Sequence, residues 1–176
     1  MQEIVLRPVT LDDAAMIHAI YSASVLRETA SWEYAPPDVD EMRRRLQAIL
    51  DHSYPYFVAV DGAQVVGYTY AGPYRPRIGY RFTVENSIYV DPAYQRRGIA
   101  RRLMTHLIDA CTDRGFRQMI AVIGDSQNVA SIALHCQLGF TRVGLLPNIG
   151  FKFDRWLDGV LMQRTLGDGH ATRPTA

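Results

Sequence analysis

The sequence predicts an α/β fold built on a mixed sheet, and three observations lead to that fold class. Short runs of β-branched and aromatic residues alternate with amphipathic segments of helical period, which is typical of a sheet with parallel strands. The dipeptide Asp61-Gly62 between two apolar runs predicts a hairpin, which adds an antiparallel part. The chain has 176 residues, of which 48% are hydrophobic and 21% charged, so one core can form without disulfide bonds.

The expected elements are bounded by recognisable start and stop signals. Thr10 and Asp13 form a capping box, and apolar residues follow them at the spacing of a first helix. Gly115 and Gly139 stand where two later helices are expected to end. We expect the other helices at 38–51, 100–114 and 130–138, and strands at 3–7, 56–60, 65–71, 82–90, 119–123 and 160–165, with a further strand that begins at 140–143.

Two segments are expected to be irregular because proline and glycine interrupt them. Residues 31–37 combine aromatic side chains with prolines, and residues 72–81 contain two prolines, two glycines and three arginines. We expect residues 1–166 to form a single domain. The small and polar residues 167–176 are expected to form a flexible C-terminal tail.

Charge and composition exclude several classes of protein. A formal net charge of +1 lacks the basic field of a nucleic-acid binder. No apolar run reaches the length of about 18 residues that a membrane span needs, and the first residues do not resemble a signal peptide, so we expect a cytoplasmic protein. The two cysteines, Cys111 and Cys136, allow no disulfide framework, and no histidine spacing predicts a metal site.

The basic residues are unusual because Lys152 is the only lysine among nineteen lysines and arginines. Arginine presents a planar fork that matches carboxylate and phosphate oxygens. Residues 43–45 form one cluster, which fits the solvated face of a helix. The two other clusters lie in loops beside strand and helix ends, where anions often bind. One comprises Arg75, Arg77 and Arg81, and the other comprises Arg96, Arg97, Arg101 and Arg102.

The segment Gln95-Arg96-Arg97-Gly98-Ile99-Ala100 joins an expected strand to an expected helix. The first N–H groups of a helix have no partner within it, and the helix dipole adds partial positive charge there. Gly98 removes a side chain where the backbone has to come close to a ligand. The segment therefore predicts a pyrophosphate site.

This Gln-x-x-Gly-x-Ala segment resembles the acetyl-CoA-binding motif of the GCN5-related N-acetyltransferases (GNAT), and it matches neither a Walker loop nor a dinucleotide fingerprint. The resemblance covers roughly residues 3–166. It implies the GNAT fold, a mixed and mostly antiparallel sheet with a splayed parallel pair at the cofactor site and flanking helices. It also implies a homodimer, acetyl-CoA as co-substrate, and cofactor contacts from Ile88, Tyr89, Val90, Gln95, Arg96, Arg97, Gly98, Ile99, Ala100, Arg101, Asn128 and Ser131.

Four separate segments, 70–77, 83–90, 121–123 and 150–156, resemble one branch of that family, together with His135. The branch contains phosphinothricin and methionine sulfoximine acetyltransferases, which acetylate the α-amine of small amino-acid analogues. Met104 stands where some herbicide-detoxifying members have a tyrosine, which favours sulfoximine or sulfone acceptors. The resemblance implies that the acceptor is contacted by Arg75, Pro76, Arg77, Glu85, Asn86 and Ser87.

An acetyltransferase has to remove a proton from its acceptor, because an ammonium nitrogen has no free lone pair with which to attack a thioester. Glu85 is the general base that the resemblance implies, and burial would raise its pKa toward neutral pH. The alternative for Glu85 is an ion pair with a nearby arginine. Strand alternation places Glu85 and Ser87 on one face and Asn86 on the other. Either Arg75 or Arg77 can bind a carboxylate or phosphinate through two hydrogen bonds.

Several alternatives stay open at the level of sequence. Direct transfer is favoured over an acetyl-cysteine, since Cys111 falls on an apolar helix face and adjacent helical residues such as His135 and Cys136 point in different directions. His135 either helps to move a proton or packs near the cofactor. Trp32, Lys152 and Trp156 either pack or reach the acceptor pocket. The other functions considered are a GNAT enzyme for a polyamine, an antibiotic or a protein N-terminus, and a non-catalytic acyl-CoA sensor.

Overall fold

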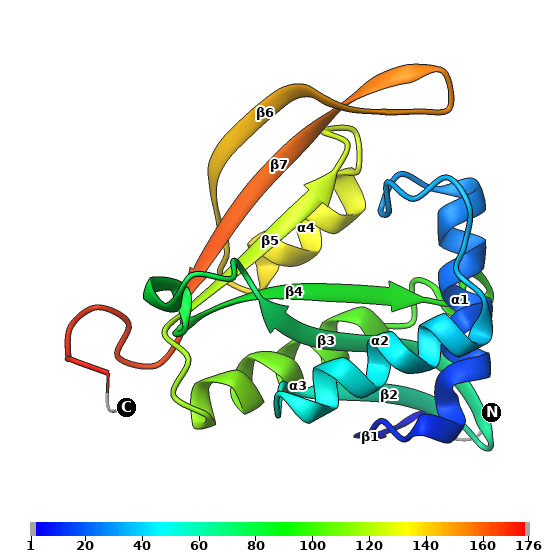
Figure 1. The fold of residues 1–176 in the computed structure, drawn as a ribbon, viewed down its shortest axis with the longest axis horizontal. Coiled ribbons are helices and arrows are strands. Elements are labelled where there is room, and N and C mark those ends of the chain that lie inside the picture. The colour runs from blue at the N-terminus through cyan, green and yellow to red at the C-terminus, as the bar shows by residue number, and fades with distance from the viewer. Residues whose placement is uncertain (1–2, 175–176) are drawn as a thin grey trace.

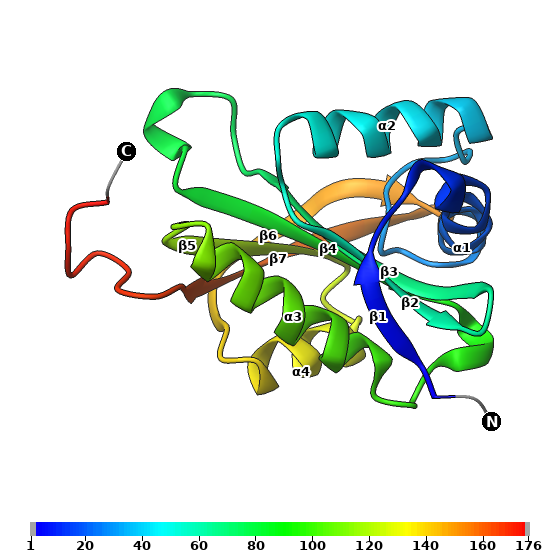
Figure 2. The same cartoon turned by 90° about the horizontal axis from the view of Figure 1, so that it is seen from below.

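A seven-stranded mixed sheet with the order β1-β2-β3-β4-β5-β7-β6 runs through the computed structural model, which describes residues 3–174 (Figure 1). The strands are β1 Val5–Pro8, β2 Tyr56–Asp61, β3 Gln64–Pro73, β4 Thr83–Val90, β5 Gln118–Gly124, β6 Thr141–Lys152 and β7 Arg155–Thr165. The helices are α1 Ala14–Arg27, α2 Val39–Asp51, α3 Ile99–Asp113 and α4 Val129–Gln137. Figure 2 shows α1 and α2 on one face of the sheet and α3 and α4 on the other.

The centre of the sheet contains a parallel pair that separates. Strands β4 and β5 are paired only from Thr83 opposite Gln118 to Glu85 opposite Ile120, and every other strand pairing is antiparallel across the described residues. Beyond Glu85 the two strands diverge (Figure 1). The mixed α/β fold with a splayed parallel pair is therefore confirmed. The divergence leaves backbone groups of β4 and β5 without a strand partner in the middle of the sheet.

Each face of the sheet packs against its own pair of helices. Leu103, Met104 and Leu107 of α3 are fully buried in the core on one face, and Ile17 and Leu46 are buried in the core on the other. The capping box predicted before the first helix is present, and the predicted hairpin joins β2 and β3. These local signals agree with the tertiary packing, which is the condition for a single stable fold.

Two expectations about the elements were wrong in part. Residues 72–81 are not irregular throughout, because β3 continues to Pro73 and Ile78–Tyr80 forms a short 3₁₀ turn. The strand predicted to begin at 140–143 does begin there, as β6, whereas the last strand, β7, starts at Arg155 and is longer than the predicted 160–165. Two register shifts in β6, around Gly144 and between Leu146 and Gly150, interrupt the two-residue alternation that reveals a strand in a sequence.

The arginine cluster at 43–45 is not merely a solvated face. Arg45 bridges α2 to the segment after α1, because its guanidinium contacts Glu41 Oε1 at 2.9 Å and Glu33 Oε1 at 2.7 Å. Arg44 pairs with the other oxygen of Glu41 at 2.7 Å. No helix within residues 3–174 has the length and apolarity to cross a membrane, and no group of three ligand-type side chains there is placed to hold a metal ion.

Candidate active site

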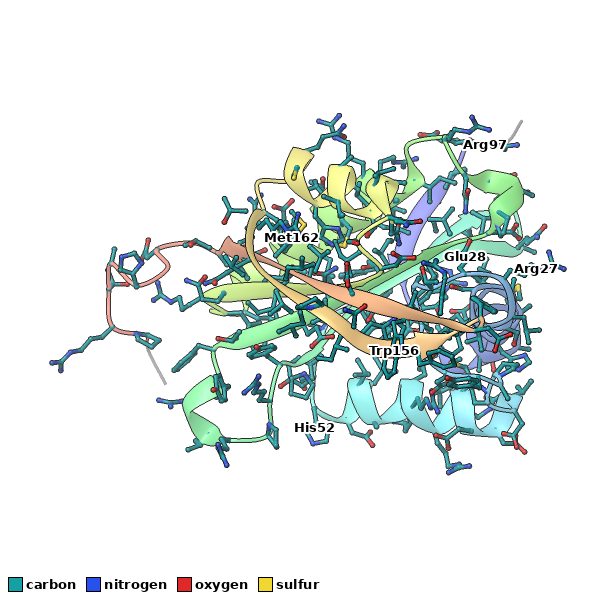
Figure 3. The ribbon with its side chains drawn as sticks, turned by 90° about the horizontal axis from the view of Figure 1, so that it is seen from above. Arg27, Glu28, His52, Arg97, Trp156 and Met162 are labelled. Carbon is teal, nitrogen blue, oxygen red and sulfur yellow. The ribbon has the colours of Figure 1, made fainter. Side chains whose placement is uncertain are left out.

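A cavity of about 1010 Å³ opens along β4, between the end of α1 and the starts of α3 and α4. In Figure 3, Arg97 marks the loop before α3, while Arg27 and Glu28 mark the end of α1. All the residues predicted to contact the cofactor line this cavity except Arg97, whose guanidinium lies 4.6 Å from the ring centre of Tyr94. The lining residues from that prediction are Ile88, Tyr89, Val90, Gln95, Arg96, Gly98, Ile99, Ala100, Arg101, Asn128 and Ser131.

The start of α3 is built to leave its N–H groups available to a ligand. Gly98 is the N-cap residue, has φ +74°, and supplies no side chain to cap the helix. A β-carbon added at Gly98 would meet no other atom within 4 Å, so the space there is open. Arg96 and Arg101 line the same cavity. Free N–H groups, a helix dipole and two guanidinium groups together favour a phosphorylated ligand.

A second cavity of about 320 Å³ lies where β4 and β5 separate. It adjoins the first cavity, because Ile88, Tyr89, Asn128 and Ser131 line both. Its other lining residues include three of those predicted to contact the acceptor, Glu85, Asn86 and Ser87, and the predicted accessory residue His135. The structure thus brings these four side chains to one place from β4 and α4.

Glu85 has the environment of a general base. It is half-buried and forms no ion pair among residues 3–174, so the structural alternative for this carboxylate is absent there. Burial raises the pKa of Glu85, since removal from water disfavours the ionised form. A carboxyl group with a raised pKa at the wall of a cavity is typical of a proton acceptor that works near neutral pH.

Asn86 and His135 form a buried pair on the opposite face of β4. His135 Nδ1 lies 2.8 Å from the carbonyl oxygen of Ser131, which only accepts, so Nδ1 carries the proton. His135 Nε2 then accepts from Asn86 Nδ2 at 3.0 Å. Burial lowers the pKa of His135, which favours this neutral form. Asn86 Oδ1 is left buried without a hydrogen-bond partner, and such an acceptor is suited to a ligand donor.

The arginines predicted to bind the acceptor are not part of either cavity. Arg75, Pro76 and Arg77 are exposed, and the guanidinium of Arg75 lies 5.2 Å from the ring centre of Tyr74. Strands β3 and β4 stay paired as far as Pro73 opposite Val84, so the connection 74–82 leaves the sheet beyond Glu85. In the single chain Arg75 and Arg77 therefore line neither cavity, and their contact with the acceptor stays a prediction.

Trp32 lines the second cavity and fits into a recess between strand ends. A β-carbon at Gly124 would lie 2.6 Å from Trp32 Nε1, and one at Gly150 would lie 2.8 Å from a ring carbon. Glycine is needed at both positions because any side chain would displace the indole. The role of Trp32 cannot be predicted from the sequence, since Gly124 and Gly150, which form the recess, lie more than ninety positions from Trp32 in the chain.

Lys152 fixes the segment that carries Trp32. Its buried ammonium group donates to the carbonyl oxygens of Glu28 at 2.9 Å and Ser31 at 2.6 Å. Burial lowers the pKa of Lys152, while the two carbonyl groups accept from two of its three N–H donors. Lys152 and Trp156 line neither cavity, and Trp156 is exposed, so the structure assigns packing to Lys152 rather than contact with the acceptor.

Comparison with known proteins identifies the family. The profile of the acetyltransferase (GNAT) family matches residues 17–140. The chain belongs to the GNAT family. A phosphinothricin N-acetyltransferase of Alcaligenes faecalis is 48% identical over 168 residues, which span 96% of this chain and 85% of that protein. An L-methionine sulfoximine/L-methionine sulfone acetyltransferase of Salmonella typhimurium is 42% identical over 159 residues, which span 90% of this chain and 92% of that protein.

Solved structures of GNAT proteins agree with this fold. A GNAT superfamily phosphinothricin acetyltransferase from Sinorhizobium meliloti, solved in complex with acetyl-CoA, superposes with a TM-score of 0.95 at 47% sequence identity. The comparison covers 98% of this chain and 93% of that one. The predicted family and its branch are confirmed, and the GNAT chain described here is an acetyltransferase.

Proposed function

We propose that this chain is a cytoplasmic N-acetyltransferase that moves the acetyl group of acetyl-CoA to the α-amine of a small amino-acid analogue. Relatives named for phosphinothricin and for methionine sulfoximine or sulfone support this class of acceptor. The observation that carries the proposal is the place of Glu85, a half-buried carboxyl group without an ion pair within residues 3–174, in the wall of the cavity that adjoins the larger one.

The larger cavity fits acetyl-CoA, which supplies an activated acetyl thioester when bound. The N–H groups at the start of α3, with Arg96 and Arg101, hold the pyrophosphate. The diverging edge of β4 offers free backbone groups to the extended pantetheine arm, as to an added strand. Asn86 Oδ1, which has no hydrogen-bond partner and belongs to a side chain that lines the adjoining smaller cavity, offers an acceptor to the ligand. These features use different atoms of the chain and favour the same ligand.

Glu85 acts as general base in the proposed mechanism. Its carboxylate takes a proton from the α-ammonium group of the acceptor, directly or through one water molecule, and so frees the nitrogen lone pair for attack. The raised pKa of Glu85 makes it a stronger base near neutral pH. Ser87, next on the same face of β4, offers a hydroxyl group to the acceptor.

Transfer is direct rather than through an acetyl-cysteine. Cys111 is fully buried in the core, as predicted, and burial raises the pKa of its thiol to about 12, so little thiolate forms near neutral pH. Cys136 is exposed and lines neither cavity, whereas the adjacent His135 is buried. No pair of nucleophile and base therefore forms between Cys136 and His135.

The proposal includes a homodimer and contacts from Arg75, Pro76 and Arg77 to the anionic part of the acceptor. The edge strand β6 and its neighbour carry exposed apolar side chains, which a second copy of the chain can cover. These residues are Val143, Leu145, Leu146, Ile149, Phe151 and Trp156. Since Arg75 and Arg77 line neither cavity of their own chain, either the second copy receives them or the connection 74–82 moves.

An acceptor panel tests the proposed function. Release of free CoA thiol is followed with acetyl-CoA and methionine sulfone, methionine sulfoximine, phosphinothricin, a polyamine or a short peptide. We expect the amino-acid analogues to give the highest kcat/KM. A peptide that exceeds every free amino acid would contradict the small-molecule acceptor. Absence of thiol release with any acceptor, while CoA still binds, would favour an acyl-CoA sensor.

A further inference from the structure

The turn of the β6–β7 hairpin reaches the larger cavity, although it lies far in sequence from the phosphate-binding segment. Phe153 and Arg155 both line this cavity, together with residues 27–30 at the end of α1. Figure 1 shows the tip of this hairpin beside the segment that follows α1. The bonds from Lys152 to that segment hold the hairpin there. The turn is therefore a fixed wall of the cleft on a side that the Gln-x-x-Gly-x-Ala segment does not cover.

The backbone of this turn is unusual for the residues it contains. Phe153 and Asp154 have φ values of +53° and +55°, which favour glycine or asparagine in a two-residue hairpin turn. Two other non-glycine residues with positive φ, Arg96 and Asp125, line the same cavity. Side chains kept at strained positions around one cavity indicate that the side chains are used there.

Phe153 and Arg155 present complementary chemistry to the cavity. Phe153 is 48% exposed, and although the ammonium nitrogen of Lys152 lies 4.9 Å from the centre of its ring, part of the ring is open to an apolar contact. Arg155 Nη2 lies 2.5 Å from Oδ2 of the buried Asp125, and this ion pair orients the guanidinium group. A guanidinium group has several N–H donors, so Arg155 can hold Asp125 and an anionic ligand at the same time.

Asp125 links this turn to the segment that carries Asn128. Its Oδ1 accepts from the backbone N–H of Gln127 at 3.0 Å, and its carbonyl oxygen accepts from the N–H of Asn128 at 3.1 Å. Asn128 caps α4 by accepting from the N–H of Ser131. The pair of Arg155 with Asp125 therefore connects the hairpin to the start of α4 across the mouth of the cavity.

We propose that the β6–β7 turn is part of the CoA-binding site, in which Phe153 packs against the bound cofactor and Arg155 attracts its anionic groups. This inference rests on the proposed use of acetyl-CoA and does not depend on the acceptor or on Glu85. The cofactor has apolar and aromatic parts as well as phosphates, which match the ring and the guanidinium group at the turn.

Two variants with matched controls test the inference by calorimetric titration with CoA. Phe153→Gly suits the positive φ and removes the ring together with its contact to the Lys152 ammonium group, so we expect a slightly lower thermal midpoint and a Kd raised about fivefold, the loss typical of an aromatic contact. The control Ser53→Gly changes another residue with positive φ, outside the cavity, and is expected to leave the Kd unchanged.

Arg155→Gln is expected to raise the Kd for CoA and to make that Kd less dependent on salt concentration, because it removes a positive charge from the cavity. The control Arg142→Gln removes a charge outside the cavity and is expected to have neither effect.

The outcomes separate this inference from the proposed function. If the wild-type chain binds CoA and both variants bind it within about twofold of wild type, the turn takes no part in the site. If Phe153→Gly changes the molar mass in light scattering but not the Kd, the ring belongs to a protein interface, which also overturns the inference. If the wild-type chain does not bind CoA, the proposed function fails and this inference fails with it.

Discussion

The two cavities beside the separation of β4 and β5, the proposed cofactor side and the proposed acceptor side, are built in different ways. The largest continuous part of the cofactor side is residues 88–101, which form the end of β4, a loop and the start of α3. The acceptor side combines Trp32, Glu85 and Gly124 with parts of α4. A site formed by one stretch of chain keeps its geometry once that stretch adopts its backbone conformation. A site formed by several distant segments depends on the packing of the whole sheet.

Two glycines illustrate this difference. Gly98 has φ +74° and open space around its missing side chain, so its glycine serves the backbone conformation and the approach of a ligand. Gly124 has no positive φ, but a β-carbon there would lie 2.2 Å from the carbonyl oxygen of Thr29. Glycine is needed at position 124 because the segment that carries Trp32 packs closely against it. The same residue type thus supports local conformation on one side and tertiary packing on the other.

Glu85→Gln is expected to have the largest effect, because it removes the proposed base without changing the shape of the acceptor side. We expect kcat to fall by about 10² to 10⁴. The Kd for CoA, measured by calorimetry, should stay near the wild-type value, since the cofactor side is untouched. A variant that keeps its kcat, or that loses CoA affinity instead, would contradict the role of Glu85.

The pH dependence follows from the raised pKa of Glu85. Activity needs the ionised form, so kcat/KM should fall as the pH decreases through this raised pKa, which lies above the ordinary value of about 4.3. The folded chain binds this proton more tightly than the unfolded chain, so the Glu85 contribution to the free energy of unfolding is lost as pH rises through the raised pKa. Glu85→Gln should lack this loss in chemical denaturation between acid and neutral pH.

Gly124→Ala and Gly98→Ala are expected to separate the two sides. Gly124→Ala should lower the free energy of unfolding by about 1–3 kcal/mol, through the clash with Thr29, and raise KM for the acceptor. Gly98→Ala should cost about 1 kcal/mol, through its positive φ, and raise KM for acetyl-CoA. Urea denaturation and steady-state kinetics measure both. Equal effects on both KM values in either variant would show that the two sides are not independent.

Arg75→Ala and Arg77→Ala test whether these exposed residues belong to the acceptor side. We expect each to raise KM for a carboxylate-bearing acceptor about tenfold, as for the loss of a charge-assisted contact, with little change in KM for acetyl-CoA. Arg44→Ala is the matched control, since Arg44 is also an exposed arginine and its recorded ion pair is to Glu41 on its own helix. Kinetics in which Arg75→Ala and Arg77→Ala match the control would remove these arginines from the site.

Cys136→Ser is expected to have the smallest effect. Cys136 is exposed and lies outside both cavities, so direct transfer predicts an unchanged kcat. Mass spectrometry after mixing with acetyl-CoA should find no acetyl group on this residue. A covalent acetyl-Cys136 that disappears when the acceptor is added would overturn direct transfer.

Features that depend on neighbouring residues in the chain could be predicted from the sequence. The capping box at Thr10, the hairpin at Asp61 and the helix start at Gly98 are each specified by a few consecutive residues, and the structure contains all of them. Strand alternation also separated Glu85 from Asn86, which face different sides of the sheet. The wider family resemblance rested on the order of such local motifs.

The way in which distant segments meet became known from the folded chain. It placed Trp32 between Gly124 and Gly150, brought Phe153 and Arg155 to the cofactor cleft, and left Arg75 and Arg77 outside both cavities. The physical reason is that the conformation of a turn or helix end depends on adjacent residues, whereas the closing of a cavity depends on how far apart two strands separate and which loops fill the space. No short stretch of sequence contains that information.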